Sequence, residues 1–322
     1  MEQETKHLSP TVRASLHAAI PATWKSASWL LQLMIPISLA VTLMHHFGLL
    51  EWIAGYLNPL FVHLGLPGSS AVIFLSGASA GTYAGLAAMM SVPLTMKQAT
   101  ILSLMIALCH ALPMECAVNR KTGSSFWTMA LLRIGMAFAC AAGMNLFLPE
   151  LPGRFIYLGA AAESGLTDVL LTWAVAQVKM ALMVFLIIYL LMALQRFIEA
   201  YGLLRPLSER LAPLMRLFGL PRRSAYMWLV GNVLGISYGS AVMVELEEKG
   251  VVKREEANEV NYHLIMNHSL LEDTVVFALA GIHAPLLVST RVACAILLVW
   301  LRRGIKRGGC RLRKREPAGD LF

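Results

Sequence analysis

Two short polar motifs interrupt apolar stretches of this sequence. Residues 109–116 read Cys-His-Ala-Leu-Pro-Met-Glu-Cys, and residues 267–273 read Asn-His-Ser-Leu-Leu-Glu-Asp. Imidazole and carboxylate groups can bind a polar solute, coordinate a metal ion or act as a general acid or base. Inside a bilayer an ionisable group costs at least ~2.5–3.5 kcal/mol on insertion scales, so each should face a cavity or a partner.

An arginine follows each motif at the same distance along the chain. Glu115 precedes Arg133 by 18 residues, and Asp273 precedes Arg291 by 18 residues. A glycine near the middle of each interval indicates a turn, so antiparallel neighbouring helices would hold each acid and its arginine at similar depth. These pairs are predicted either to lock helices together or to gate or bind a solute, and the sequence leaves these roles open.

Soft and borderline metal ligands surround the first histidine. Cys109, Met114 and Cys116 lie beside His110, with the two cysteines seven residues apart on one helical face. Their spacing matches no established metal-binding motif. If the arginines neutralise the acids of the two pairs, Glu272 is the one uncommitted carboxylate of the second motif, which disfavours a cation site. The metal stays unknown, with these four residues around the first motif as candidate ligands.

Two glycine-rich apolar segments, 71–90 and 225–244, supply further polar side chains. Their glycines allow close helix packing, and packing alone is one explanation for them. The alternative is that two hairpin tips meet the interrupted helices near the membrane midplane and form a binding site there. The predicted substrate-binding residues are Ser79, Thr82, His110, Glu115, Asn232, Ser237, Asn267, His268, Glu272 and Asp273.

The chain contains an internal repeat. A shift of 154 residues carries the glycine spacing of residues 77–85 onto residues 231–239, and a shift of 158 residues carries His110 onto His268. Glycines, prolines, histidines and arginines all match in one order, which a chance alignment of leucines would not produce. The sequence therefore predicts a duplicated unit.

The elements that must position these residues are transmembrane helices. Of 322 residues, 57% are hydrophobic and 14% charged, and the mean hydropathy is +0.63. A soluble domain has about 45–50% apolar and about 25% charged residues. Stretches such as 27–44, 170–194 and 285–301 approach the ~20 residues that cross a hydrocarbon core.

The net charge of +8 does not indicate a nucleic-acid partner. Much of this charge lies in residues 302–315, after the last apolar stretch, where membrane proteins collect cytoplasmic cations. The five cysteines are odd in number and form no disulfide framework, and no cofactor is predicted. Residues 1–22 lack the pattern of a secretory signal peptide, so we expect the N-terminus to be retained.

The distribution of Lys and Arg between the two sides of the membrane distinguishes two possible topologies. If both glycine-rich segments re-enter as hairpins, each unit crosses three times, and the basic regions 196–223 and 302–315 share one side; full crossings would place them on opposite sides. We therefore predict an all-α integral membrane protein with two inverted repeats, each containing an interfacial helix, a re-entrant hairpin, a broken transmembrane helix and flanking transmembrane helices. Both termini are expected in the cytoplasm, with the chain in the cell (inner) membrane.

This topology divides the chain into five parts. They are a cytoplasmic N-terminal segment (1–22), a first membrane repeat (23–149), a connecting loop (150–165), a second membrane repeat (166–303) and a basic cytoplasmic tail (304–322). Within the interfacial helices, Pro59 and Pro213 are expected to kink or split the helix, because proline removes a backbone donor.

The order of amphipathic stretch, glycine-rich hairpin and broken helix resembles the Gate or "nucleoside recognition" domain family, which is related to concentrative nucleoside transporters and to the membrane part of ferrous-iron transporter B. The resemblance covers roughly residues 23–303. It implies a transport-type fold with a midplane site between hairpins and broken helices, and it implies no particular substrate. Unlike the iron transporter, this chain has no GTPase domain, no Gly-Lys-Ser/Thr phosphate loop and no clear Gly-x-Gly-Cys motif in the membrane.

Three functions are compatible with these observations. The first is transport of a small polar solute by alternating access, with a nucleoside-like solute as one option. The second is a divalent-metal permease that uses the first motif and His268, and the third is a non-transporting membrane scaffold or accessory subunit. No nucleophile with an oriented base is present, so we do not expect an enzyme. The expected partners are the lipid bilayer and a small-molecule or ion substrate, and a homo-oligomer is left open.

Overall fold

The computed structural model describes residues 2–158 and 165–313, and within these ranges the chain is helical. The first half contains α1 (Glu2–His46), α2 (Leu49–Val62), α3 (Ser70–Ala80), α4 (Thr82–Met90), α5 (Met96–Cys109), α6 (Leu112–Lys121) and α7 (Phe126–Phe147). The second half contains α8 (Leu166–Ala200), α9 (Leu204–Leu211), α10 (Ala225–Val233), α11 (Ile236–Glu248), α12 (Arg254–Asn267), α13 (Leu270–Leu279) and α14 (Ala284–Arg313). The all-α prediction is confirmed, since the described residues form no strand beyond one isolated bridge.

Four helical segments of the described chain are long and apolar enough to cross a membrane. They are Met96–Lys121, which includes α5 and α6, and then Phe126–Phe147, Leu166–Ile198 and Ala284–Lys306. The outward face of α8 carries leucines that no other part of the described chain covers; Leu171 and Leu182, for example, are more than half exposed. An uncovered apolar face of this length fits lipid rather than water.

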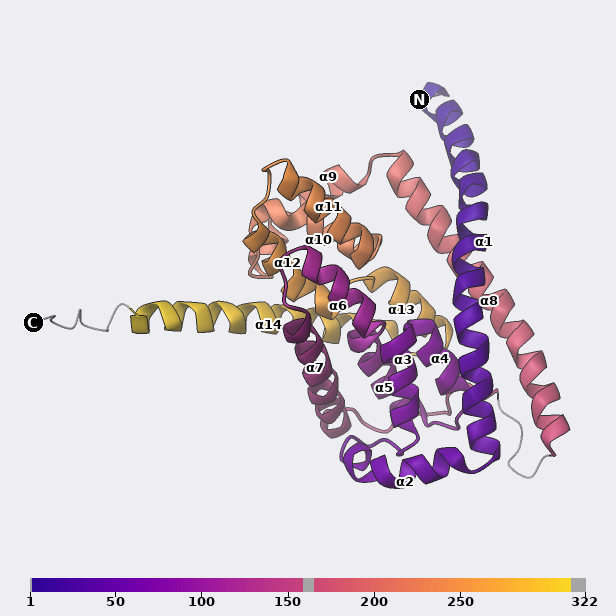
Figure 1. Cartoon of the computed structure of the whole chain (residues 1–322). Helices are drawn as coiled ribbons and strands as arrows, with labels where there is room; N and C mark the ends of the chain where they lie inside the picture. The colour runs from indigo at the N-terminus through magenta and orange to yellow at the C-terminus, as the bar shows by residue number, and fades with distance from the viewer. Residues whose placement is uncertain (1, 159–164, 314–322) are drawn as a thin grey trace, which may run out of the picture.

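The glycine-rich segments fold as pairs of short helices that pack against each other. α3 and α4 meet at Gly81, whose φ is 106°, and α10 and α11 meet at Gly235, whose φ is 88°. These positive φ values favour glycine, because an L-side chain would crowd the backbone. Each pair stands beside the broken helix of its own half (Figure 1).

Helices α5 and α12 contact each other near the centre of the molecule. Every residue of α5 from Ala99 to Cys109 is buried, as are the last five residues of α12, 263–267. The long helices α1 and α8 pack along one another at one side (Figure 1). The middle of the molecule is therefore built from both halves of the chain.

The two prolines behave differently. Around Pro213 the chain forms α9 followed by a short 3₁₀ turn at Leu214–Arg216, so the segment is split. Pro59 instead lies inside α2, which continues to Val62. It sits in the last turn, where the loss of one backbone donor interrupts little of the helix, and the expectation of a split there is wrong.

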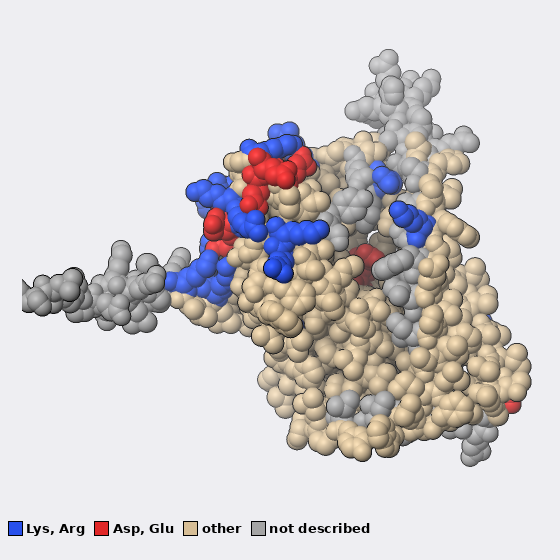
Figure 2. All heavy atoms as spheres, in the orientation of Figure 1, with Lys and Arg blue, Asp and Glu red and all other residues tan. Residues whose placement is uncertain are grey.

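Charged side chains gather at one end of the molecule. Figure 2 shows them over α9, α11 and α12, whereas the middle and the opposite end of this face are almost uniformly uncharged. Exposed members of this group include Arg205, Glu209, Glu245, Lys249 and Arg254. Helix α2 lies at the other end (Figure 1). The molecule thus has one charged end and one largely uncharged end.

We predict that mild oxidation will join the two halves through Cys140 on α7 and Cys294 on α14. Their Sγ atoms lie 3.1 Å apart, so a small approach reaches the ~2.05 Å of a disulfide bond. Peptide mass spectrometry after copper-phenanthroline treatment should find the linked peptides, and Cys140→Ser should abolish the link. Absence of this link in oxidised wild-type protein would contradict the placement of α7 beside α14.

Candidate functional site

The two broken helices contain the same backbone irregularity. The gap between α5 and α6 holds Ala111 with φ of 45°, and the gap between α12 and α13 holds Ser269 with φ of 50°. They are the only non-glycine residues with positive φ in the described ranges. Such a conformation costs an L-residue roughly 1–2 kcal/mol, so surrounding contacts must hold each break in place.

Each break is held by the neighbouring hairpin. The N–H of Ala111 donates to Gly77 O at 3.1 Å, and the N–H of Ser269 donates to Gly231 O at 3.3 Å. A Cβ atom on Gly77 would lie 2.9 Å from the side chain of Ile106, so glycine is what lets α3 approach the broken helix. The two accepting glycines are related by the same 154-residue shift that aligns the hairpins.

Arg133 on α7 binds the polar groups that the first break leaves free. Its Nε donates to Leu108 O at 2.8 Å, its Nη2 donates to His110 O at 2.9 Å, and its Nη1 donates to Glu115 Oε2 at 2.6 Å. The guanidinium therefore satisfies two carbonyls that the interrupted helix leaves free and also neutralises the acid in the first turn of α6.

Arg291 on α14 makes the same three contacts in the second half. It donates to Met266 O at 3.0 Å, to His268 O at 2.6 Å and to Asp273 Oδ2 at 2.9 Å. Both arginine side chains are at most 1% exposed. All four residues stand 158 positions after their first-half counterparts, so the duplication extends to individual hydrogen bonds.

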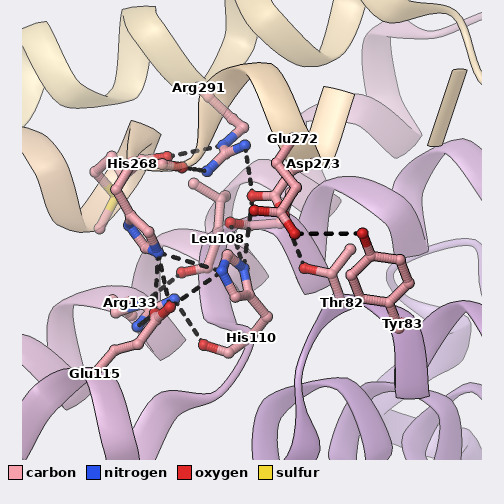
Figure 3. Close-up of polar contacts among 12 residues, drawn as sticks. Thr82, Tyr83, Leu108, His110, Glu115, Arg133, His268, Glu272, Asp273 and Arg291 are labelled. Carbon is pink, nitrogen blue, oxygen red and sulfur yellow. Dashed lines mark hydrogen bonds and ion pairs between the residues drawn. The ribbon is translucent and has the colours of Figure 1, made fainter. Parts of the chain in front are cut away.

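The halves also contact each other directly. Thr82, at the tip of the first hairpin, donates to Asp273 Oδ1 at 2.8 Å, and Tyr83 OH donates to Glu272 Oε1 at 3.3 Å (Figure 3). The 154-residue shift carries Thr82 onto Ile236, which has no side-chain donor. The second hairpin therefore cannot make the equivalent bond to Glu115.

Glu115 is held by two histidines instead. His268 Nε2 lies 3.0 Å from each oxygen of the Glu115 carboxylate, His110 Nε2 lies 3.2 Å from Oε1, and the two Nε2 atoms are 3.2 Å apart (Figure 3). All three side chains are buried. In the described part of the chain these residues form the one group of metal-ligand side chains whose donor atoms lie within 4.8 Å of one another.

A second polar group lies in the second half alone. Trp228 Nε1 donates to His263 Nδ1 at 2.9 Å, and Asn267 Oδ1 lies 3.1 Å from the same nitrogen. Four buried polar atoms on α10, α11 and α12 have no partner in the described part of the chain: His263 Nε2, Asn267 Nδ2, Asn232 Oδ1 and Ser240 Oγ. The equivalent first-half positions carry mostly apolar side chains: Phe74, Ala78, Leu86, Met105 and Cys109. Unpaired buried polar atoms are costly, so a water or solute is expected to satisfy them.

Two comparisons with known proteins bear on this arrangement. A sequence profile of the Gate family, described as nucleoside recognition, matches residues 27–124. Over 293 residues the chain is 30% identical to the uncharacterized membrane protein YvoD of Bacillus subtilis (strain 168), covering 88% of this chain and 91% of that protein. The chain belongs to the Gate family of membrane proteins. No solved structure shows a significant match to it.

The profile match ends just after α6, so it covers the first hairpin and first break of this Gate-family protein. The repetition of the same hydrogen bonds at Arg291 extends that architecture to the second half. Together with its apolar helices, the family assignment identifies the chain as a membrane protein of a transport-related family.

The structure distributes the predicted site residues of the Gate-family protein unevenly. His110, Glu115, His268, Asp273, Glu272 and Thr82 converge at the two breaks. Asn232 on α10 and Asn267 at the end of α12 each carry a buried polar atom without a partner. Ser79 is exposed and donates to Leu75 O of its own helix. Ser237 belongs to α11, but its side chain lies outside the described residues.

The predicted sulfur ligands are placed differently from the expectation. Met114 is 52% exposed, and Cys109 and Cys116 are buried outside the group formed by His110 and Glu115 with the second histidine. The positive φ of Ala111 interrupts the helix between the cysteines, so they do not share one helical face.

Two functional candidates were missing from the predicted site. Tyr83 follows Thr82 at the hairpin tip and reaches Glu272. His263 precedes Asn267 by four residues, which places both on one face of α12. This i, i+4 spacing beside the second motif is a signal that would have identified the histidine from the sequence.

We predict that Arg133→Leu will lower the melting temperature of the protein in detergent strongly. The change leaves a buried carboxylate and two buried carbonyls without their donor, and breaking a buried ion pair costs roughly 3–5 kcal/mol. Arg205→Ala, in an exposed pair on α9, should change stability by at most ~1 kcal/mol.

The double variant Arg133→Leu/Glu115→Leu should recover part of the stability lost in Arg133→Leu, because it removes the uncompensated charge. Equal melting temperatures for Arg133→Leu and Arg205→Ala would contradict the buried pairing.

Proposed function

We propose that this protein transports a small polar solute across the membrane by alternating access, with the solute bound where the hairpin tips meet the two broken helices. The observation that carries this proposal is the contact between the two halves at this site, where the hairpin residue Thr82 donates to Asp273 and His110 meets His268. Charges this deeply buried at the contact between two half-chains are typical of transport sites, which lie between repeats.

The unpartnered atoms of the second half supply the polar surface for this solute. Asn232 Oδ1 accepts, Asn267 Nδ2 donates, and His263 Nε2 carries the remaining ring proton because Nδ1 accepts from Trp228. A molecule with neighbouring hydroxyl, amide or ring-nitrogen groups would satisfy them. The Gate family's description names nucleosides, so nucleosides and nucleobases are the first solutes to test.

The arrangement of the ends supports an inverted pair of repeats. Helices α2 and α9, which the repeat makes equivalent, lie at opposite ends of the molecule (Figure 1). In this proposal the charged end over α9, α11 and α12 faces the cytoplasm of the cell (inner) membrane. The two hairpins then re-enter from opposite faces, each reaching a broken helix near the midplane, and both termini are cytoplasmic.

Two features favour movement at this site. The breaks leave short helices, α6 and α13, joined to α5 and α12 through single strained residues, so rotations there disturb few helical hydrogen bonds. An acidic side chain is also visible at the floor of a hollow in the uncharged middle of the molecule (Figure 2). Rocking one half against the other would expose this polar core to either side in turn.

The direct test is uptake into proteoliposomes. We expect saturable uptake of at least one solute from a panel of radiolabelled nucleosides, nucleobases and organic anions. Asp273→Asn should reduce uptake at least about tenfold, since it removes the charge that organises both Arg291 and Thr82. Ser79→Ala, on the exposed side of the first hairpin, should transport normally. Protein that is folded, correctly inserted and silent toward the whole panel would contradict the proposal.

A second prediction separates solute binding from folding. Asn267→Cys and Asn232→Ala install the residues that the first half carries at the equivalent positions. Because those residues fit the same backbone, both variants should keep a wild-type melting temperature within a few degrees. Their thermal stabilisation by the transported solute should be lost, since it depends on the affinity of the folded state. Undiminished stabilisation in both variants would exclude this polar group from the solute site.

A further inference from the structure

Three ligand atoms from two halves of the chain converge on one point. His110 Nε2, His268 Nε2 and Glu115 Oε1 form a triangle with edges of 3.2, 3.0 and 3.2 Å. His110 and Glu115 stand on either side of the first break, and His268 stands at the second. The triangle therefore exists only when the two broken helices are in contact.

The tautomers of both histidines are set by backbone carbonyls. His110 Nδ1 lies 3.2 Å from Ala107 O, and His268 Nδ1 lies 2.8 Å from Leu264 O. A carbonyl oxygen can only accept, so each Nδ1 must carry a hydrogen and donate it. In the neutral rings, both Nε2 atoms then present lone pairs.

Three electron-rich atoms thus point at one another inside a buried site. Two imidazole lone pairs and a carboxylate oxygen repel at 3.0–3.2 Å unless a positive charge lies among them. Arg133 does not supply it, because its Nη1 donates to the other carboxylate oxygen, Oε2, and its remaining donors bind carbonyls. The arginine leaves Oε1 free for a cation.

The size of the triangle fits a tetrahedral transition metal. Metal–nitrogen and metal–oxygen bonds of about 2.0–2.2 Å place neighbouring ligands of a tetrahedron about 3.3–3.6 Å apart, within a few tenths of an ångström of the observed edges. Two imidazole nitrogens select zinc-like, cobalt or ferrous ions over calcium and magnesium, which prefer oxygen ligands. A carbonyl acceptor on the second ring nitrogen is also the usual support for a metal-binding histidine.

The surrounding charges allow a divalent ion. Three carboxyl side chains, Glu115, Glu272 and Asp273, gather near two guanidinium groups. Asp273 Oδ2 lies 3.8 Å from His110 Nδ1, so an acid stands behind one of the ligand rings. The site is therefore richer in potential negative charge than the two ion pairs alone indicate.

We propose that His110, His268 and Glu115 bind one divalent transition-metal ion, with the fourth position open to water or to a donor atom of the solute. This inference rests on the proposed function, because it assigns an inorganic ligand to the same polar core. Of the ligands that the metal-permease hypothesis drew from the first motif and His268, it keeps two histidines and one glutamate and leaves out the sulfur ligands.

The test uses full-length protein in detergent, stripped of metal with a chelator and titrated with Co²⁺. We expect one equivalent to bind with the intense visible absorption of tetrahedral cobalt, and Zn²⁺ should displace it in equal amount. His268→Ala and His110→Ala should each weaken binding at least about tenfold, because each removes a ligand. His283→Ala is the matched control, an exposed histidine between α13 and α14 outside the triangle, and should bind cobalt normally.

Failure of this inference is distinguishable from failure of the proposed transport. Folded wild-type protein that binds neither Co²⁺ nor Zn²⁺ overturns the metal site without any variant, and the charge among the three lone pairs is then a proton. Cobalt binding that survives in both histidine variants also overturns it. Solute uptake by protein that binds no cobalt would support transport and overturn the metal site, whereas stoichiometric cobalt binding without solute uptake would support the metal site and contradict transport.

Discussion

The structure depends on how a helix can be interrupted inside an apolar protein. Breaking α5 and α12 frees backbone carbonyls and forces Ala111 and Ser269 into a costly conformation. One arginine from the following helix resolves each break by binding two carbonyls and the nearest acid. A hairpin glycine accepts the remaining amide. Without these contacts the polar core would have no stable geometry.

The two halves share the same backbone arrangement around the breaks, but several of their polar side chains differ. Both halves repeat the arginine, the acid, the histidine and the glycine-supported break. Only the second half carries the buried group of Trp228, His263 and Asn267. The first hairpin instead contributes Thr82, whose counterpart is Ile236. Each half therefore supplies what the other lacks, and the polar core requires both.

The parts of this site that lie within one half were predictable, because regular intervals between residues along the chain indicate them. The 18-residue intervals around glycine turns indicate that Glu115 and Asp273 lie at the depth of their arginines, and repetition marks the hairpins. The approach of His110 to His268 has no such signal, since the two residues are 158 positions apart and no periodicity encodes contacts between halves. The cysteines were misplaced because helical spacing was extended across a break that a left-handed residue creates.

The placement of each arginine on the same half as its acid has a consequence for how the chain is made. The ribosome delivers α5, α6 and α7 well before α12, so Glu115 enters the membrane long before His268 has been synthesised. Arg133 follows Glu115 by only one turn and part of a helix, and the pair is neutral by itself. The buried charges of the first break are thereby balanced before the second half is made. The contact between His110 and His268 can then form as the last step of assembly, when both halves are in place.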